Sequence, residues 1–551
     1  MQGFAFSYLA YLVNLPQMST FFSGGTIWAS YGKTLDSLRV EGGRIVGINC
    51  EANPSDEMVD LGEGFLAPAF MDGHAHPLFG GREGQGPQVN GLQSIKEIVD
   101  EVKNFATANQ DKEWIIGGAY EAAIIERGDF LATWLDEAVT DRPVVLHAAD
   151  HHTIWVNSKA LEVAGITAAT IDPDGGTIAR NEDGSPRGTL REPAAMDLIH
   201  RHTPVRTIED DIAALQWTCD RYLESGLTAA CDAWVEPGMA EAYIEASKRG
   251  ILAIDFDLFF LAQPDSWRER IPYFAQLREE IATLGENSHL TARTIKFIGD
   301  GALSAGTAAL LDPYLDDPSS SGLLIWKTEE MAEAATYFDA QGYQLHLHAI
   351  GDAAVRQALD VIEKVQATNP TWNRRPVIVH AQLITESDIP RFAALGVIAN
   401  YQPLWMYLDP MNKELIAPRI GDERNNRQYP LATMAKTGVR ISYGSDWPVT
   451  SYLPLLALGV PTHRQSPDGT QSQPWSPKES VSVEESLRNY TENVAFQMFR
   501  DESVGKLEVG FQADLVVLRH NPLRAAPSEI SSIQVLATYK SGRRFEGKHI
   551  G

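Results

Sequence analysis

The sequence predicts an α/β fold in which eight parallel strands alternate with helices in a (β/α)8 TIM barrel. Three observations support this prediction. A helix–glycine–strand pattern recurs along the middle of the chain, its strands are almost continuously apolar, and the two chain ends carry a hairpin-like pattern instead. A small β-sandwich domain formed by both ends and a large insertion after the first barrel strand complete the predicted architecture.

The recurring module has an amphipathic helix, then a glycine, then a short β-rich run. A glycine in this place closes the helix in a left-handed conformation. Strands that are apolar on both faces are typical of a parallel sheet covered on both sides. The module glycines are Gly226, Gly250, Gly342, Gly396 and Gly438.

Three further runs, "FLAPAFMD", "ARTIKFIGD" and "RRPVIVHAQ", bring the number of predicted strands to eight between Phe65 and Asp446. A doubly wound open sheet is the alternative fold. However, no glycine-rich phosphate loop follows the first strand. The sequence therefore favours the barrel.

The predicted domain boundaries follow the change of pattern. Glycine-rich hairpins at 18–64 and 495–551 are expected to form the small β-sandwich, and residues 65–494 the barrel. Residues 80–210 are too many for an ordinary βα connection, so they predict a folded insertion. Insertions at the catalytic end of a barrel commonly form lids or substrate walls.

Composition limits the compartment and the partners. A formal net charge of −27 argues against a nucleic-acid or anionic-membrane partner. Three scattered cysteines form no disulfide framework, which fits a cytoplasmic location. Residues 1–17 are apolar but lack the pattern of a signal peptide and are too short to span a bilayer; their role is left open. A homodimer through the small β-domains is compatible with the sequence.

The stretch "FLAPAFMDGHAHP" ends a predicted strand with His-x-His, and four other predicted strands also end near metal-ligating or ionisable side chains. In a barrel these ends converge on one mouth. Neutral imidazoles and carboxylates are a zinc-type ligand set, so the sequence predicts one or two zinc ions there. The converging residues are His74, His76, Lys296, His348, His380 and Asp446.

Some assignments have alternatives. His346 lies on the same strand face as His348 and competes with it, although His348 is nearer the strand end. Lys296 is costly as a buried cation, and reaction with CO2 to a carbamate would turn it into an oxygen ligand able to bridge two metals. An ion pair with Asp300 or another acid is the other role for this lysine. In the insertion, His147, His151 and His152 are each expected to be structural or surface histidines, rather than metal ligands, when taken singly.

Taken together, these motifs resemble the amidohydrolase superfamily, and further motifs resemble its YtcJ-like branch, which includes N-substituted formamide deformylases. The similarity runs from Phe21 to Phe545 and implies metal ligands at the six residues named above. It also implies that His152 faces the substrate cavity. Substitutions at Ser304, Ala305, Gly306, Ala353 and Tyr120 depart from the branch pattern and affect the expected substrate. The motifs are "HHTIWVNSKALEVAGI", "DGGTIARNEDGSPRGTL", "KFIGDGALSAGTAAL", "HAIGDAAVRQALD", "YGSDWPV" and "GKLEVGFQADLVVL".

The expected activity is metal-dependent hydrolysis of a carboxamide C–N bond in a small molecule. Asp446 is expected to act as general base, and His152 to donate a hydrogen bond to the substrate. A lactone, carbamate or cyclic-amide hydrolase is an alternative on the same site, and a non-catalytic sensor or regulatory protein is an alternative of another class. Each of the six ligand positions carries a residue that can bind a metal, which argues against a non-catalytic protein.

An apolar arm on the substrate is expected from the predicted wall. An uncharged aromatic wall suits an aryl or alkyl group attached to the scissile amide. Arg187 is the one nearby cation that we can name, and we expect it to be solvated. The wall residues are Tyr120, Trp155, Trp405, Met406 and Trp447.

Overall fold

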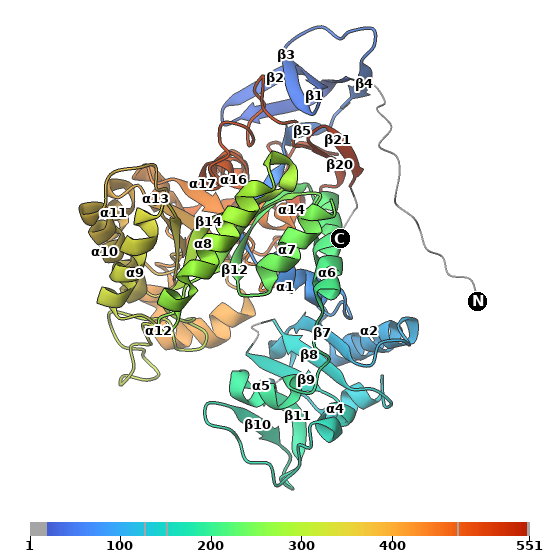
Figure 1. Ribbon diagram of the computed structural model, residues 1–551, viewed down its shortest axis with the longest axis vertical. Helices are drawn as coiled ribbons and strands as arrows, with labels where there is room; N and C mark the ends of the chain where they lie inside the picture. The colour runs from blue at the N-terminus through green and yellow to red at the C-terminus, as the bar shows by residue number, and fades with distance from the viewer. Residues whose placement is uncertain (1–18, 126–127, 150–151, 471–472, 548–551) are drawn as a thin grey trace.

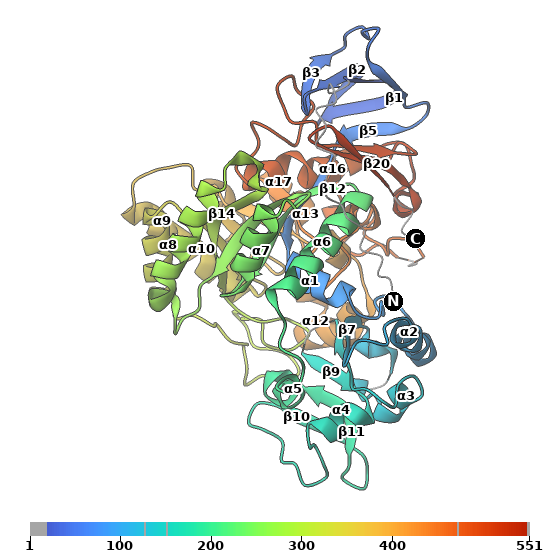
Figure 2. The same cartoon turned by 45° about the vertical axis from the view of Figure 1, so that its right-hand side comes forward.

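The computed structural model describes residues 19–125, 128–149, 152–470 and 473–547. Residues 1–17 and His151 therefore lie outside the described residues. The barrel forms the middle of the molecule, with the small β-domain at one end and the insertion at the other (Figures 1 and 2).

Eight parallel strands form the barrel, which confirms the predicted fold class. All five module glycines have positive φ, between 64° and 90°, as the helix-closing role requires. The sheet closes where Asp446 N donates to His74 O (2.8 Å) and His76 N donates to Trp447 O (2.7 Å). In hydrogen-bonded order the strands are β6 (Phe70–Ala75), β12 (Leu227–Val235), β13 (Asp255–Leu261), β14 (Leu290–Ile298), β15 (Gln344–Ala349), β16 (Val377–His380), β17 (Ile398–Tyr401) and β18 (Ile441–Tyr443).

Helices cover the outside of the barrel and bury their apolar faces against it. They are α6 (Ile208–Glu224), α7 (Met239–Lys248), α8 (Trp267–Thr283), α9 (Thr328–Ala340), α10 (Asp352–Thr368), α11 (Ile389–Ala394), α13 (Leu431–Lys436), α14 (Pro454–Leu458), α15 (Val460–His463) and α16 (Val483–Tyr490). α12 (Ala417–Asn425) belongs to a separate apolar cluster, in which Ile420 packs with Leu303 and Ile350. A last helix, α17 (Glu492–Gln497), closes the barrel floor, where Ala495 and Met498 pack on Met71 and Phe259.

The expectation of one strand over "FLAPAFMD" was wrong. Residues Phe65–Pro68 form β5, which pairs with the small domain, and the barrel begins at β6. The backbone changes partner at this point, because Ala69 N donates to Asp514 O (2.9 Å) whereas Phe70 N donates to Gly226 O (3.0 Å). Both halves are apolar and buried, so periodicity alone could not separate them.

Both chain ends join in one eight-stranded sheet that curls around its own apolar core. Its strands are β1 (Thr20–Ser30), β2 (Lys33–Glu41), β3 (Arg44–Ile48), β4 (Glu57–Asp60), β5, β19 (Leu515–Leu518), β20 (Val535–Lys540) and β21 (Arg543–Glu546). The edge strand β3 meets the segment before β19, with Ile45 N donating to Phe511 O (2.9 Å). The layers of the predicted sandwich are therefore parts of one hydrogen-bonded sheet.

The insertion is a separate five-stranded sheet with its own core. Its strands are, in order, β10 (Thr177–Arg180), β11 (Pro186–Arg191), β9 (Thr153–Val156), β8 (Val144–Ala148) and β7 (Ile115–Tyr120). Its helices are α2 (Ile95–Ala108), α3 (Ala132–Asp136), α4 (Ser158–Val163) and α5 (Glu192–His200). α1 (Pro77–Gly84) leads into it beside α6. Gly81 allows this approach, since a Cβ there would lie 2.5 Å from Ala214 O. No helix in the described ranges combines the length and the apolarity that a bilayer crossing requires.

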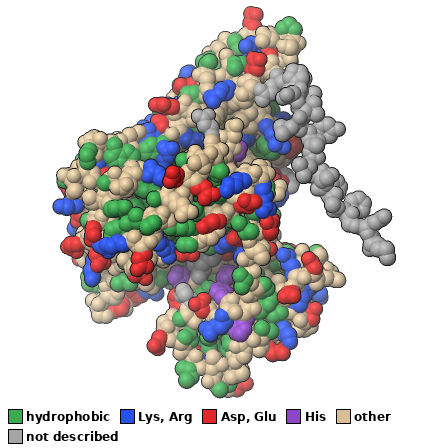
Figure 3. All heavy atoms as spheres, in the orientation of Figure 1, with side chains coloured by type: hydrophobic (Ala, Val, Ile, Leu, Met, Phe, Trp, Pro, Cys, Tyr) green, Lys and Arg blue, Asp and Glu red, His purple; other side chains and the backbone are tan. Residues whose placement is uncertain are grey.

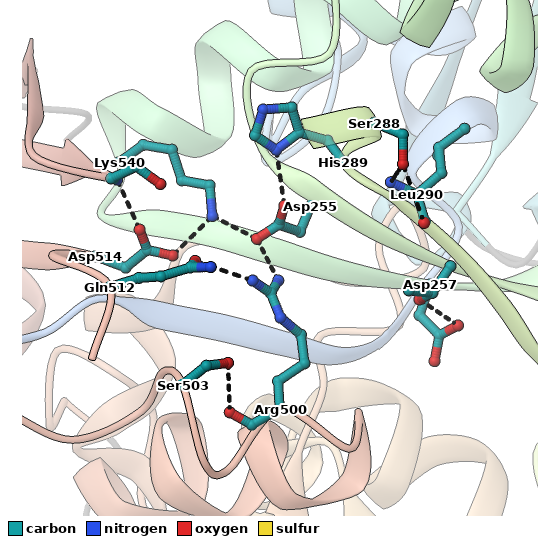
Figure 4. Close-up of polar contacts among 12 residues, drawn as sticks. Asp255, Asp257, Ser288, His289, Leu290, Arg500, Ser503, Gln512, Asp514 and Lys540 are labelled. Carbon is teal, nitrogen blue, oxygen red and sulfur yellow. Dashed lines mark hydrogen bonds and ion pairs between the residues drawn. The ribbon is translucent and has the colours of Figure 1, made fainter. Parts of the chain in front are cut away.

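A buried ion network joins the barrel to the small domain (Figure 4). Asp255, at the start of β13, forms ion pairs with Lys540 of β20 and with Arg500, and it lies 2.7 Å from His289 Nδ1. Lys540 Nζ also donates to Asp514 (2.7 Å). Burial opposes ionisation of Asp255, but its cationic neighbours outweigh burial and hold the pKa of its carboxyl well below the usual value.

We predict that Asp255→Asn lowers the free energy of unfolding by about 3 kcal/mol, because it leaves the buried Lys540 and the largely buried Arg500 with less compensating charge. The depressed pKa means that the stabilisation is complete above the unfolded pKa of about 4 and is lost as pH falls through the lower folded value. Urea titrations at several pH values measure both effects. Asp36→Asn, at an exposed position of β2, is the matched control. Equal stability of the two variants would contradict the prediction.

Candidate active site

The strand ends bring the predicted ligands together at the mouth that faces the insertion. Asp446 Oδ1 lies 3.2 Å from His74 Nε2 and 3.1 Å from His76 Nε2. The His380 ring lies 5.2 Å from that of His74 and 4.5 Å from that of His348. Ligand atoms of His74, His380 and Asp446 all lie within 4.8 Å of one another, a spacing that suits one metal ion.

Two of these residues have an unusual backbone. His380 has φ 70° and Asp446 has φ 57°, in the left-handed region that side chains other than glycine rarely adopt. Each such conformation costs on the order of 1–3 kcal/mol and persists only where surrounding contacts enforce it. This backbone conformation directs both side chains toward His74.

Asp72 holds the turn that carries Asp446. Its carboxylate accepts hydrogen bonds from Ser445 N (2.9 Å), Ser445 Oγ (2.5 Å) and His74 N (3.3 Å). Burial raises the pKa of Asp72 to about 6, although the Ser445 hydrogen bonds oppose this shift. Sequence reasoning missed this residue, and the signal for it was a lone carboxylate inside an otherwise apolar strand.

His346 and His348 occupy different levels of the barrel. His348 lies at the mouth beside His380, and its side chain keeps 18% exposure. His346 is fully buried beside His74, with the two ring planes 4° apart and His346 Nε2 2.9 Å from His74 Nδ1, as in an in-plane hydrogen bond. His346 therefore orients His74 and leaves Nε2 of His74 facing Asp446.

Lys296 is buried near the other ligands. Burial lowers the pKa of its amine to about 7, while Asp446 acts in the opposite direction. Asp300, the alternative partner, instead accepts hydrogen bonds from the backbone N–H groups of Ile350, Gly351 and Ala309. Within the described part of the chain, no ion pair joins Lys296 to Asp300.

The electrostatics of the site suit a divalent cation. Burial lowers the pKa of His74 and His380 well below the usual histidine value and that of His348 to about 3, so their ring nitrogens are neutral donors. Burial favours the acid form of Asp446, but the His76 hydrogen bond and nearby imidazoles hold its pKa below the usual value. His76 Nδ1 is buried without a hydrogen-bond partner among the described residues. The donor set therefore fits a metal ion.

The aromatic surroundings differ in part from the prediction. Trp405 stacks on His380 with ring centroids 5.2 Å apart and planes 1° apart, so its ring lies beside the predicted ligands. Sequence reasoning missed two further aromatics, Trp234 and Phe79, whose rings lie 6.2 Å and 6.3 Å from that of His76. Their positions, at the end of β12 and three residues after His76, could have identified them.

The other predicted wall residues are packing residues, which corrects the prediction. Tyr120 and Trp155 are fully buried in the insertion core, where Phe130 lies 4.8 Å and 4.7 Å from their rings. The Trp447 ring packs outward against Trp217 and Tyr452, at centroid distances of 6.2 Å and 5.0 Å. Met406 is also fully buried. These side chains supply the apolar contacts that a small inserted sheet and a barrel edge need.

The insertion places histidines next to the barrel (Figure 3). His152 is more than half exposed, and its Nδ1 lies 3.0 Å from Glu192 Oε2. His147 Nε2 lies 3.2 Å from His200 Nε2. Arg187 donates from Nε to Asp129 O (3.1 Å) and is partly exposed.

Comparisons with known proteins agree with this geometry. Over 543 residues the chain is 27% identical to a Bacillus subtilis (strain 168) protein named as an amidohydrolase, YtcJ, covering 96% of this chain and 99% of that one. It is 28% identical over 530 residues to the N-substituted formamide deformylase of Arthrobacter pascens, covering 92% and 94% of the two chains.

Among solved structures, an uncharacterized metal-dependent hydrolase from Pyrococcus furiosus matches with a TM-score of 0.70 at 25% identity. The match covers 92% of this chain and all of that one. The model of the amidohydrolase family matches residues 57–545, which include all eight barrel strands and every predicted ligand. The protein described here is thus a member of the amidohydrolase family.

Proposed function

We propose that the protein is a metal-dependent hydrolase of neutral N-substituted amides. The observation that carries this proposal is the placement of Asp446, an ionised carboxylate whose Oδ1 lies 3.2 Å and 3.1 Å from two histidine nitrogens. A carboxylate base held beside neutral imidazoles that can ligate a metal ion is the arrangement that hydrolysis by an activated water needs. The name of the Arthrobacter pascens relative supports the amide class.

The metal centre would be held by the six predicted residues, and zinc is the ion that this donor set favours. When bound, such an ion lowers the pKa of water and polarises the substrate carbonyl. Asp446 accepts the proton of the attacking water as the new C–O bond forms. It then delivers that proton to the amide nitrogen as the C–N bond breaks, which regenerates the carboxylate.

Lys296 would contribute as a carbamate. With a pKa lowered to about 7, a large fraction of the amine is neutral at neutral pH and can attack CO2. The N–C bond forms as one oxygen takes the electron pair, and the released proton leaves to solvent. The carbamate replaces a buried positive charge by a negative one and supplies two oxygen ligands.

The substrate arm is expected to lie against Trp405, Trp234 and Phe79. All three are partly buried beside the ligand imidazoles, so each keeps some accessible aromatic surface. Aromatic surface of this kind binds aryl and alkyl groups through apolar contact. His152, on the insertion, would donate a hydrogen bond to the substrate when the insertion approaches the mouth.

Metal content should depend on Lys296. Protein produced with added zinc should contain about one to two equivalents by elemental analysis. Lys296→Met, which removes the amine but keeps an apolar stem, should lose both metal and activity, because no carbamate can form. Lys364→Met, on an exposed part of α10, is the matched control. Full activity of chelator-treated, metal-free protein would contradict the proposed function.

Asp446→Asn should reduce kcat and kcat/KM together by about 1,000-fold, because the proton transfer that it removes occurs only in the transition state. Steady-state kinetics with the zinc-loaded variant, together with its metal content, separate loss of the base from loss of the ion. Asp174→Asn, on the exposed insertion surface, should behave as wild type. A change confined to KM would show that Asp446 only shapes the pocket.

Substrate preference tests the apolar contact surface. N-benzylformamide and related neutral amides should be hydrolysed faster than N-acyl amino acids, hydantoins or lactones, because the surface beside the ligands is aromatic. Arg82, whose guanidinium lies 5.4 Å from the centre of the Phe79 ring, is already paired with Asp211 (2.8 Å). A screen of kcat/KM over these four classes measures the preference. Faster turnover of hydantoins or lactones would instead favour a cyclic-amide or lactone hydrolase on the same site.

A further inference from the structure

Four polar side chains lie buried between the barrel floor and the candidate metal centre. Each has no measurable exposure, so each must satisfy its hydrogen bonds inside the protein. They come from three elements that are distant along the chain: β17 and the residue after it, β18, and α17. The four are Asn400, Gln402, Ser442 and Gln497.

The order of hydrogen bonds starts at a backbone carbonyl. Gln497 Nε2 donates to Gly73 O at 2.6 Å, and a carbonyl oxygen can only accept. The amide of Gln497 is therefore oriented with Oε1 on its other side. There, Oε1 accepts from Asn400 Nδ2 (3.1 Å) and from Ser442 Oγ (2.6 Å).

The orientation of the Gln497 amide determines those of the Asn400 and Gln402 amides in turn. Since Asn400 Nδ2 is directed at Gln497, Asn400 Oδ1 faces the opposite way and accepts from Gln402 Nε2 at 3.1 Å. Gln402 Oε1 is then left to face His380 Nδ1, at 2.7 Å. An amide oxygen has no proton to give, so the hydrogen of this bond must reside on Nδ1 of His380.

We propose that Gln497, Asn400 and Gln402 form a directional relay by which the Gly73 carbonyl sets the tautomer of His380. With its proton on Nδ1, the neutral imidazole presents the lone pair of Nε2 to the mouth. The proposal rests on the proposed function only in taking Nε2 of His380 as a metal ligand. The three amides are positioning residues, since none of them touches the reacting atoms.

Gly73 is suited to this role by its size as well as by its carbonyl. A Cβ at this position would lie 2.7 Å from Asn400 Nδ2 and 3.3 Å from Gln497 Oε1, so a larger residue would displace the relay. Because Gly73 directly precedes His74, the strand that supplies two ligands also orients a third, on β16. The close approach of Asn400 and Gln497 explains why a glycine suits position 73, in "DGHAHP".

His74 lacks an equivalent device. Its Nδ1 contacts Nε2 of His346 at 2.9 Å, and either nitrogen can carry the shared proton. His346 Nδ1 is buried without a hydrogen-bond partner among the described residues, so no obligate acceptor sets the direction there. The tautomer of His380 is set by a chain of amides, whereas that of His74 can adjust when an ion binds.

Neutron diffraction from deuterated wild-type crystals grown without added metal tests the relay directly. Neutrons distinguish nitrogen from oxygen and show deuterium, which ordinary X-ray maps do not. The expected result is a deuteron on Nδ1 of His380, none on Nε2, and the three amides oriented as above. A deuteron on Nε2, or a reversed Gln402 amide, overturns the proposal. Neither result depends on whether the protein hydrolyses amides.

A second test measures the consequence for the metal. Gln402→Met removes the acceptor with little change in volume and should weaken zinc binding by about 10–100-fold in a chelator competition. Gln357→Met is the matched control, because Gln357 is also buried but donates to Trp326 O and Thr328 Oγ1 (both 3.0 Å), away from the ligands. Unchanged affinity in Gln402→Met, or equal weakening in the control, overturns the relay.

Discussion

The closure of the barrel between its first and last strands is the constraint on which the candidate site depends. Two backbone hydrogen bonds, from Asp446 N to His74 O and from His76 N to Trp447 O, join these strand ends at 2.8 Å and 2.7 Å. They bring the carboxylate of Asp446 to 3.1 Å from the Nε2 atom of His76, a residue 370 positions earlier. Without this closure the base and two of the expected ligands would lie at opposite edges of an open sheet. The left-handed backbone of Asp446 then turns its side chain inward, and the hydrogen bonds of Asp72 to the preceding serine hold that turn.

Burial gives these side chains their chemistry. Removing imidazoles from water favours their neutral form, which is the form that binds metal ions. The same burial makes an unpaired polar atom costly, by roughly 1–3 kcal/mol for each one, which favours interior polar groups that have partners. Asp300 accepts three backbone N–H groups, and the amides that begin at Gln497 are satisfied in sequence up to His380. The hydrogen bonds that pair these buried polar groups therefore also orient the ligands.

The two additional parts of the chain act at opposite ends of the barrel. The curled sheet of the chain termini is fixed to the barrel through the ion network around Asp255, far from the mouth. The insertion lies at the mouth, but its large aromatics are used for its own core, since a small five-stranded sheet has little other apolar surface to bury. The accessible aromatic surface beside the ligands comes instead from residues at or after barrel strand ends, Trp405, Trp234 and Phe79. The aromatic residues that stabilise the insertion are thus different from those that are accessible beside the ligands.

The sequence by itself determined the barrel, its module glycines and the six residues that converge at its mouth. Each of these follows from a local pattern: a helix-closing glycine, an apolar strand, or a ligating side chain at a strand end. Only the tertiary structure decided which neighbour each side chain meets. It separated β5 from β6, placed His346 beside His74 and His348 at the mouth, gave Asp300 to backbone amides rather than to Lys296, and turned Trp447 away from the site. It also connected Gln402 to His380 and Gly73. The physical reason is that periodicity specifies the face on which a side chain lies, whereas its partner comes from a strand or loop that may be hundreds of residues away.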